Sequence, residues 1–394
     1  MQLLRNRPFA LVCLLSMVAV ATVVIACSSS GDNASATPTH STAATSTGAL
    51  STAAATGTST VSACPPSGAA TKLSADGSTF VQPLFSDWFT RYDTLCSIQV
   101  NYQSTGSGQG ITDLSNKNVD FADSDAIMTD AQKTAATGGT VAHIPMTSDA
   151  VAVIYNVEGV ANLGITLDGA TLANIFLGKI TKWNDPAIKA LNTAATLPDE
   201  DIVVVYRSDG SGTTNIFTNY LDKVSTDWHS SVGTANSVQW PAGIGESGSA
   251  AVAGQVQQQP GSIGYVSLAY AVKNNISYAK LINSSGNAIE PSIASSRAAQ
   301  TGLTLPDNMQ IVITNSPNAD AYPISGFTWA LVYTTQTDKA KAETIGHLLH
   351  WMLTDAQQYA EADSFVPLSD AAQQKALAEL ATVMYQGTPV LNVN

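Results

Sequence analysis

The sequence has little positive charge. It holds 17 Lys and Arg against 30 Asp and Glu, which gives a formal net charge of -13 at pH 7. This balance argues against nucleic acid as a partner, and it removes any long-range attraction for anions. If the ligand is an anion, the site must hold it through local dipoles and hydrogen bonds.

Several catalytic motifs are also missing. The sequence contains no GxxxxGK[ST] phosphate loop, no GxSxG elbow, no HExxH spacing and no dinucleotide fingerprint between a strand and a helix. His347 and His350 lie three residues apart on a predicted helix, where packing is a more common role than metal ligation. We therefore expect no enzymatic activity, no catalytic residue, no metal and no cofactor. A phosphatase-like hydrolase remains the alternative from a different class.

Cysteine is scarce, with four residues in the chain. Cys13 lies in an apolar N-terminal run and Cys27 directly follows that run, so Cys64 and Cys96 remain. In an oxidising compartment two such cysteines are expected to form a disulfide. The alternative, a cysteine-based metal or catalytic site, lacks a CxxC spacing.

A single long apolar run is present, from Phe9 to Ala26, and it follows Arg5 and Arg7. A short basic region followed by an apolar stretch predicts a secretory signal peptide over residues 1–26. A retained transmembrane helix is the alternative, because the length is close to that of a membrane span. Cys27 directly after Val-Ile-Ala resembles the bacterial lipoprotein box, which predicts a lipid anchor at this residue.

Residues 27–63 are almost wholly Ser, Thr, Ala and Gly. Such a composition buries too little apolar surface to repay its ordering entropy, so we expect a lipid-anchored, flexible tether. An anchor followed by a tether predicts an extracytoplasmic protein that is held at the cell membrane. No second long apolar run follows, which argues against a channel, and the remaining chain is long enough for two domains.

Strand-like runs alternate with amphipathic helical stretches in the remaining chain. The predicted strands are Ser97–Tyr102, Val151–Tyr155, Ile202–Tyr206 and Trp329–Tyr333. The predicted helices are Val81–Tyr92, Gly110–Ser115, Thr213–Leu221, Thr344–Leu353 and Asp370–Met384. This alternation predicts an α/β fold with mostly parallel sheets.

Three Gly-, Ser- and Thr-rich turns each stand where a helix is expected to begin. They span residues 76–80, 105–110 and 207–214. Free N–H groups and the dipole at a helix start favour an anion, and glycine lets the backbone approach it closely. Helix capping is the alternative for any one turn. Arg207 can fork onto two oxygens of an oxyanion, or it can pair with Asp209, and the two roles are compatible.

An acidic run, residues 119–125, lies between the second and third turns. It contains Asp120, Asp123 and Asp125, which an anion site would not be expected to need. A solvated loop is one interpretation. A calcium loop is another, but the run lacks the glycine and the glutamate of an EF-hand.

Together these motifs resemble the phosphate-binding proteins of the bacterial phosphate importer. The resemblance runs from about residue 73 to the end of the chain and is carried by these segments: Ser74–Phe80, Asn101–Gly108, Val119–Asp125, Leu177–Asp185, Arg207–Thr213, Pro260–Val266, Tyr359–Ala360 and Val366–Leu368. It implies a two-lobed, type II-like periplasmic-binding-protein fold with a hinge and a ligand cleft between the lobes. We expect lobe 1 to comprise residues 64–147 and 322–394, and lobe 2 to comprise residues 148–321.

The resemblance also implies a set of ligand contacts. The implied phosphate-binding residues are Thr79, Phe80, Ser107, Asp125, Arg207, Ser211, Gly212 and Thr213, with Ser78 and Asp209 in support. Thr79 and Phe80 would bind through the backbone at the helix start and through the Thr79 hydroxyl.

Asp125 gives this set its selectivity. A buried carboxylate accepts a hydrogen bond from the proton that phosphate keeps at neutral pH, whereas sulfate has no such proton. Asp76 and Asp123 stand where the family is expected to have small uncharged residues. If Asp123 faces the same side as Asp125, it would weaken phosphate binding or raise a pKa; the alternative is that it points to solvent.

The resemblance implies that the protein delivers inorganic phosphate to the ABC permease of the importer. We expect a monomer that binds no nucleic acid and touches the membrane only through its anchor at Cys27. A receptor for another tetrahedral oxyanion, namely sulfate, molybdate or arsenate, is the alternative. An adhesion or surface-sensing role on the same scaffold is a further one.

Overall fold

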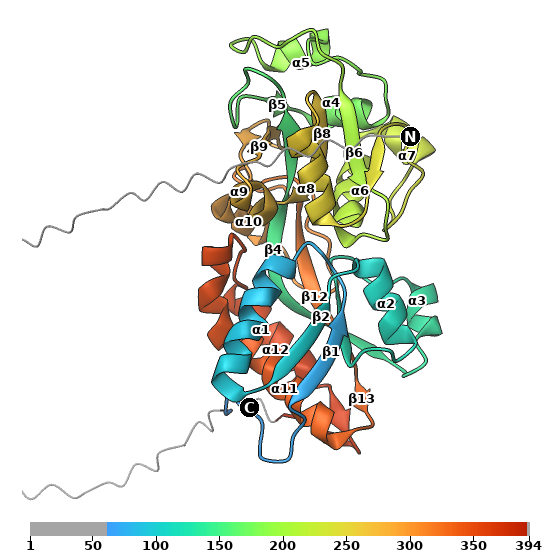
Figure 1. Ribbon diagram of the computed structural model, residues 1–394, viewed down its shortest axis with the longest axis vertical. Helices are drawn as coiled ribbons and strands as arrows, with labels where there is room; N and C mark the ends of the chain where they lie inside the picture. The colour runs from blue at the N-terminus through green and yellow to red at the C-terminus, as the bar shows by residue number, and fades with distance from the viewer. Residues whose placement is uncertain (1–60, 392–394) are drawn as a thin grey trace, which may run out of the picture. The chain divides into compact units, whose positions relative to one another are not determined.

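The computed structural model describes residues 61–391 (Figure 1). The predicted signal peptide, Cys27 and residues 27–60 of the predicted tether lie outside the described residues. Within the described range, no helix combines the length and the apolar character needed to cross a bilayer.

Strands and helices alternate along the chain, as the sequence predicts. The strands are β1 Lys72–Asp76, β2 Gln99–Gln103, β3 Phe121–Ser124, β4 Val141–Asn156, β5 Thr166–Leu167, β6 Val203–Arg207, β7 Ile244–Glu246, β8 Ser262–Ser267, β9 Ser277–Tyr278, β10 Lys280–Ile282, β11 Ala288–Ile289, β12 Ser325–Tyr333, β13 Thr335–Gln336, β14 Met384–Tyr385 and β15 Thr388–Pro389. The helices are α1 Gln82–Cys96, α2 Ser107–Ser115, α3 Asp130–Ala135, α4 Gly169–Phe176, α5 Pro186–Leu191, α6 Gly212–Val224, α7 Thr226–Ser231, α8 Ser249–Gln258, α9 Leu268–Lys273, α10 Ile293–Gln300, α11 Lys339–Leu353, the 3-10 helix η1 Asp355–Asp363 and α12 Asp370–Leu380.

Among residues 61–391, nine strands form one sheet in the order β2-β1-β3-β12-β4-β8-β6-β7, with β9 added beside β4. β1 pairs in parallel with β2 and β3, and β6 pairs in parallel with β7 and β8. The pairs of β12 with β3 and β4, and of β4 with β8 and β9, are antiparallel. The prediction of mostly parallel sheets is therefore wrong. The sheet is mixed because two long strands, β4 and β12, run in opposite directions through its middle.

β4 is the longest strand, and fifteen of its sixteen residues are buried. Residues 141–150 of β4 pair with β12, and residues 151–156 pair with β8. This change of partner lies beside Ala150, close to the predicted lobe boundary after residue 147, and β12 begins at Ser325, close to the second predicted boundary after residue 321. The same strand thus contributes to the core on both sides of the change.

Helices cover the faces of the sheet (Figure 1). α1 contacts β2, α11 contacts β1 and α12 contacts β4, whereas α6 contacts β8 and α8 contacts both β6 and β8. The amphipathic helix predicted over Val81–Tyr92 is confirmed, because its apolar side chains in α1 and the one at Phe80, just before it, are buried: Phe80, Leu84, Phe85, Trp88 and Phe89. The spacing of the apolar residues places them along one side of a helix with 3.6 residues per turn. Pro83 is tolerated because it lies in the first turn of the helix.

The C-terminal helix is shorter than predicted. α12 ends at Leu380, whereas the sequence favours a helix to Met384. Met384 and Tyr385 instead form β14, which pairs with β13 and β15. Tertiary strand pairing here overrides the local helix propensity.

The predicted disulfide is confirmed. Cys64 and Cys96 are bonded, with their Cα atoms 5.3 Å apart. Cys96 is the last residue of α1, so the bond fixes the start of the described chain to the C-terminal end of that helix.

Candidate functional site

The three Gly-rich turns lie at the carboxyl ends of β1, β2 and β6, which is where open α/β sheets bind their ligands. The turns touch although they are far apart in the sequence. The Gly108 amide donates a hydrogen bond to the Gly210 carbonyl over 2.8 Å, and the Gly106 amide donates to the Gly77 carbonyl over 2.8 Å. The structure therefore brings the turns over residues 76–80, 105–110 and 207–213 to one place.

Glycine is required at this meeting point because the backbones are in contact. A Cβ atom built on Gly108 would lie 3.0 Å from the Cα atom of Gly210. One built on Gly212 would lie 2.8 Å from both the Cβ atom and the amide nitrogen of Asp125. Side chains at these positions would hold the turns apart.

All of the predicted ligand residues are buried. The seven with side chains are Thr79, Phe80, Ser107, Asp125, Arg207, Ser211 and Thr213, and none is more than 7% exposed. Gly212 is also buried, as the first residue of α6. A buried polar group must find a partner in the protein or in a ligand, so each of these groups has to be accounted for.

Arg207 is held by a paired carboxylate. Its Nε donates to Asp209 Oδ1 over 2.7 Å, its Nη2 donates to Asp209 Oδ2, and its Nη1 donates to Ser249 Oγ over 3.1 Å. Burial alone would raise the pKa of Asp209, but the Arg207 guanidinium outweighs burial and the pKa lies below its usual value. A guanidinium carries five N–H groups, so two remain without a partner among the described residues. The ion pair and the ligand role are thus compatible.

Asp125 lies between hydroxyl donors. Ser78 Oγ donates to its Oδ2, Thr328 Oγ1 donates to its Oδ1 over 2.7 Å, and its own amide donates to Ser107 Oγ over 3.2 Å. Burial raises the pKa of Asp125 to about 6, although the hydrogen bonds from Ser78 and Thr328 and the charge of Arg207 act in the opposite direction. At neutral pH this carboxyl is therefore mostly ionised and is a hydrogen-bond acceptor.

Thr213 provides an unused hydroxyl. It is 1% exposed, and its Oγ1 has no hydrogen-bond partner within residues 61–391. Ser211 Oγ accepts the Thr214 amide as the cap of α6, which leaves the Ser211 hydroxyl hydrogen free to donate. A bound oxyanion beside the start of α6 would satisfy both groups.

The Phe80 amide differs from its predicted role, because it already donates to Ser78 Oγ over 2.9 Å. Thr79 and Phe80 also precede α1, which begins at Gln82. At least one of the amides that the sequence predicts to be free at the helix start is thus already hydrogen-bonded within the turn.

Asp123 is fully buried, so the alternative that it points to solvent is wrong. It accepts hydrogen bonds from the Tyr102 hydroxyl and, over 3.3 Å, from the Ser78 amide. Ser78 thus contacts both Asp123 and Asp125, and the two carboxyls face the same turn. Burial raises the pKa of Asp123 well above its usual value, and the charge of Asp125 adds to the rise.

Asp76 is also buried, and it accepts hydrogen bonds from the first and the second turn. Its Oδ1 accepts the Gly77 amide over 2.7 Å and the Thr105 amide over 3.1 Å, and its carboxyl accepts the Thr105 hydroxyl. Burial raises the pKa of Asp76 despite these bonds from Thr105. Asp76, where the family is expected to have a small uncharged residue, therefore has a structural role: it links the first turn to the second by hydrogen bonds.

The sequence is similar to those of known phosphate-binding proteins. The PBP superfamily domain family matches residues 37–356. The phosphate-binding protein PstS of Xylella fastidiosa is 39% identical over 312 residues, which cover 78% of this chain and 85% of that protein. The phosphate-binding protein PstS of Pasteurella multocida is 36% identical over 320 residues, which cover 79% of this chain and 90% of that protein.

The chain belongs to the PstS family of phosphate-binding proteins. A solved structure of a high-affinity periplasmic phosphate-binding protein, bound with phosphate, has a TM-score of 0.67 against this chain at 20% identity. The match covers 81% of this chain and 96% of that one. The two-lobed PstS fold that the sequence predicts is therefore confirmed.

Several residues at this PstS site were not predicted. Thr328 lies in the buried strand β12, where nothing in the local sequence marks it. Ser249 had a signal, because Ser247-Gly248-Ser249 stands where α8 begins and repeats the Gly- and Ser-rich pattern of the three turns. The Tyr102 hydroxyl lies 2.7 Å from the Ser78 carbonyl oxygen, and the Tyr270 hydroxyl lies 2.9 Å from the Thr79 carbonyl oxygen, so both tyrosines reach the first turn.

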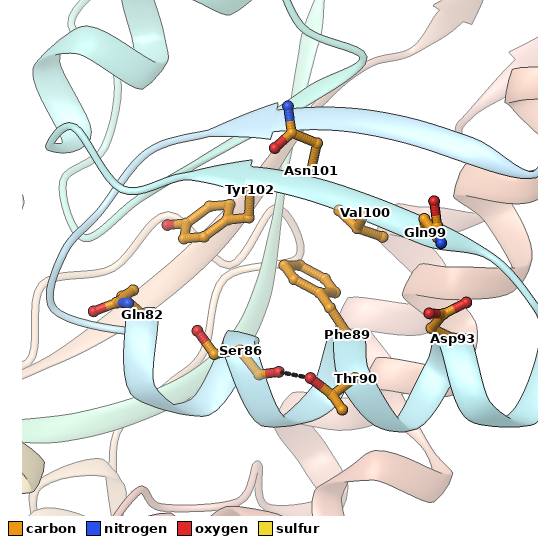
Figure 2. A pocket seen from close by; sticks show the side chains of 9 residues that line it. All are labelled: Gln82, Ser86, Phe89, Thr90, Asp93, Gln99, Val100, Asn101 and Tyr102. Atoms are coloured by element: carbon orange, nitrogen blue, oxygen red, sulfur yellow. Dashed lines mark hydrogen bonds between the residues drawn. The ribbon is translucent and has the colours of Figure 1, made fainter.

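A groove of about 430 Å³ lies between α1 and β2, outside the meeting point of the turns (Figure 2). Phe89 points into it, and polar side chains form much of the remaining lining. It contains none of the predicted ligand residues. Tyr102 is shared, since it lines the groove while its hydroxyl bonds the Ser78 carbonyl behind it.

Proposed function

We propose that this protein captures inorganic phosphate between its two lobes and delivers it to an ABC permease, without any catalytic activity. Its relatives are named as phosphate-binding proteins, and they share its sequence over most of their length. The proposed ligand contacts are the eight residues predicted from the sequence, with Ser78 and Asp209 in support. No cofactor enters the proposal.

One observation carries the choice of ligand, namely that an ionised carboxylate and a guanidinium share one buried site. Asp125, with a pKa of about 6, is an acceptor, whereas Arg207 and the Thr213 and Ser211 hydroxyls are donors. An anion that carries one proton satisfies both kinds of group. A fully ionised anion would leave Asp125 facing a lone pair, which costs at least about 1–3 kcal/mol in a dry site. Monohydrogen phosphate has the required proton, and sulfate does not.

We further propose that residues 64–147 and 322–394 form lobe 1 and residues 148–321 form lobe 2. The change of β4 from β12 to β8 at Ala150 and Val151 supports this division. The contact between Gly108 and Gly210 would then join the lobes in a closed state. Because ligand contacts come from both lobes, phosphate should favour this closed state.

The proposed location is extracytoplasmic, with a lipid anchor at Cys27 after removal of residues 1–26. The apolar run that ends directly before Cys27 supports this proposal. Incorporation of a labelled fatty acid in cells should be lost in Cys27→Ala. Labelling that survives this substitution would contradict the anchor but not the ligand.

Calorimetry on the purified protein tests the ligand. Phosphate and sulfate would be titrated at pH 7.5 into the wild type, into Asp125→Asn and into Asp320→Asn. Asp320 is an exposed carboxylate that lies outside the site, so it is the matched control. We expect tight phosphate binding, little sulfate binding, and a loss of selectivity in Asp125→Asn alone.

Two outcomes would contradict the proposal. If the folded wild type does not bind phosphate, the ligand is wrong, and arsenate and molybdate become the next anions to titrate. If it binds phosphate and sulfate equally, Asp125 does not select the anion.

A further inference from the structure

Ser249, the first residue of α8, lies beside the site although it belongs to none of the three turns. It is fully buried. Its Oγ lies 2.8 Å from Thr79 Oγ1 and accepts Arg207 Nη1 over 3.1 Å, and its amide donates to Thr79 Oγ1 over 3.1 Å. Ser249 thus links two of the proposed ligand residues, which come from opposite sides of the site.

These contacts determine what the Thr79 and Ser249 hydroxyls can do. Each hydroxyl has one hydrogen and two acceptor lone pairs. Thr79 Oγ1 already accepts the Ser249 amide, and Ser249 Oγ already accepts Arg207. Whichever hydroxyl donates to the other, one oxygen has then accepted two bonds and one O–H hydrogen is left over. The pair therefore always offers one donor, which is what an anion requires.

Tyr270, in α9, holds the same threonine from the other side. It is 7% exposed, and its hydroxyl lies 2.9 Å from the Thr79 carbonyl oxygen and 2.9 Å from Gln82 Oε1. Its single hydrogen can serve one of these acceptors at a time. Thr79 is thus bound at its hydroxyl by Ser249 and at its carbonyl by Tyr270. Both partners lie more than 160 residues after Thr79 in the sequence.

We propose that Ser249 and Tyr270 form a clamp on Thr79, which holds the first turn against Arg207 and leaves one hydroxyl hydrogen for the anion. Both are positioning residues that act through Thr79. The clamp rests on the proposed function, because it acts on that phosphate site. Its bonds join the two proposed lobes, so they add to the closed state and slow the release of phosphate.

The affinity test uses the full chain with Ser249→Ala, Tyr270→Phe and Thr79→Val, alone and in pairs. Each loss of one such bond should raise the phosphate Kd roughly five- to thirtyfold, mainly through a faster off-rate. Ser249→Ala added to Thr79→Val should cost little more than Thr79→Val alone, because the two residues act through one bond network. Ser249→Thr keeps the hydroxyl and should retain most of the affinity. Ser247→Ala is the exposed control two residues away.

Fully additive losses, or an unchanged off-rate in Ser249→Ala, would overturn the clamp. A second measurement does not depend on phosphate affinity. The Ser249 amide hydrogen is bonded to Thr79 Oγ1, so Thr79→Val should raise its hydrogen-exchange rate roughly tenfold in the closed state.

The two measurements separate the hypotheses. A wild type that does not take up phosphate contradicts the proposed function, and the clamp is then judged by exchange alone. An exchange rate that Thr79→Val leaves unchanged contradicts the clamp, even if phosphate binds tightly.

Discussion

Substitution of Gly212 by alanine should weaken phosphate binding without weakening the fold. The new Cβ atom would lie 2.8 Å from the Cβ atom and the amide nitrogen of Asp125, and 2.5 Å from Ser107 Oγ. Two of these neighbours are backbone or near-backbone atoms, so they cannot rotate away. Overpacking of this kind costs about 1–3 kcal/mol. In a closed complex the same cost corresponds to about a 5- to 150-fold rise in Kd.

The free-energy cost of the added methyl group should affect only the closing of the two lobes around phosphate. Alanine keeps the backbone N–H of residue 212, and this residue begins α6, where alanine is the better helix former. The unfolding midpoint without phosphate should therefore stay the same or rise, while the stabilisation by phosphate shrinks. Calorimetry and thermal unfolding measure the two effects. Gly254→Ala, in α8, is the control, because its Cβ atom would meet nothing within 4 Å. An unchanged Kd in Gly212→Ala would refute the close packing of the closed site.

Three other features of the described residues lead to measurable effects. The pKa of Asp125 is raised to about 6, so this carboxyl is mostly ionised at pH 7.5 and about nine-tenths protonated at pH 5. As a donor at pH 5 it should tolerate sulfate, and the selectivity for phosphate measured by competition should fall at least tenfold; a constant ratio would contradict its role. Replacing Cys64 and Cys96 by alanine opens a loop of 32 residues and should lower the free energy of unfolding by about 3.7 kcal/mol in denaturant titrations, with phosphate affinity retained. Asp209→Asn leaves the buried Arg207 without its carboxylate and should cost about 3 kcal/mol of stability, part of which saturating phosphate should restore; an equal loss with and without phosphate would argue against contact between Arg207 and the anion.

Local patterns in the sequence predicted much of the fold and the site. The Gly-rich turns, the apolar face of α1 and the disulfide depend on backbone freedom, periodicity and cysteine count, all of which can be read without tertiary structure. The implied ligand set has members in all three turns, and two of these turns meet through the bond between Gly108 and Gly210.

Other features could not be predicted, because they depend on which distant segments meet. Thr328 contacts Asp125 only because β12 lies beside β3 in the sheet. Ser249 and Tyr270 reach Thr79 from segments that begin more than 160 residues later. The mixed sheet has the same origin, since strand direction is set by crossovers and not by the composition of each strand. Asp123 is buried because Tyr102 and Ser78 supply its hydrogen bonds, and both partners are distant in the chain.

The pairing of β4 with β12 affects how the chain can mature. β12 begins 169 residues after β4 ends, at Ser325 as against Asn156 (325 − 156 = 169). At roughly 5–20 residues per second, this gap corresponds to about 8 to 34 seconds of synthesis. For that interval residues 141–150, all buried in the finished protein, have no strand on their β12 side. Such an unpaired apolar edge is a template for aggregation. Until Ser325 has been synthesised, the unfinished chain must therefore stay unfolded or have this edge bound by another protein.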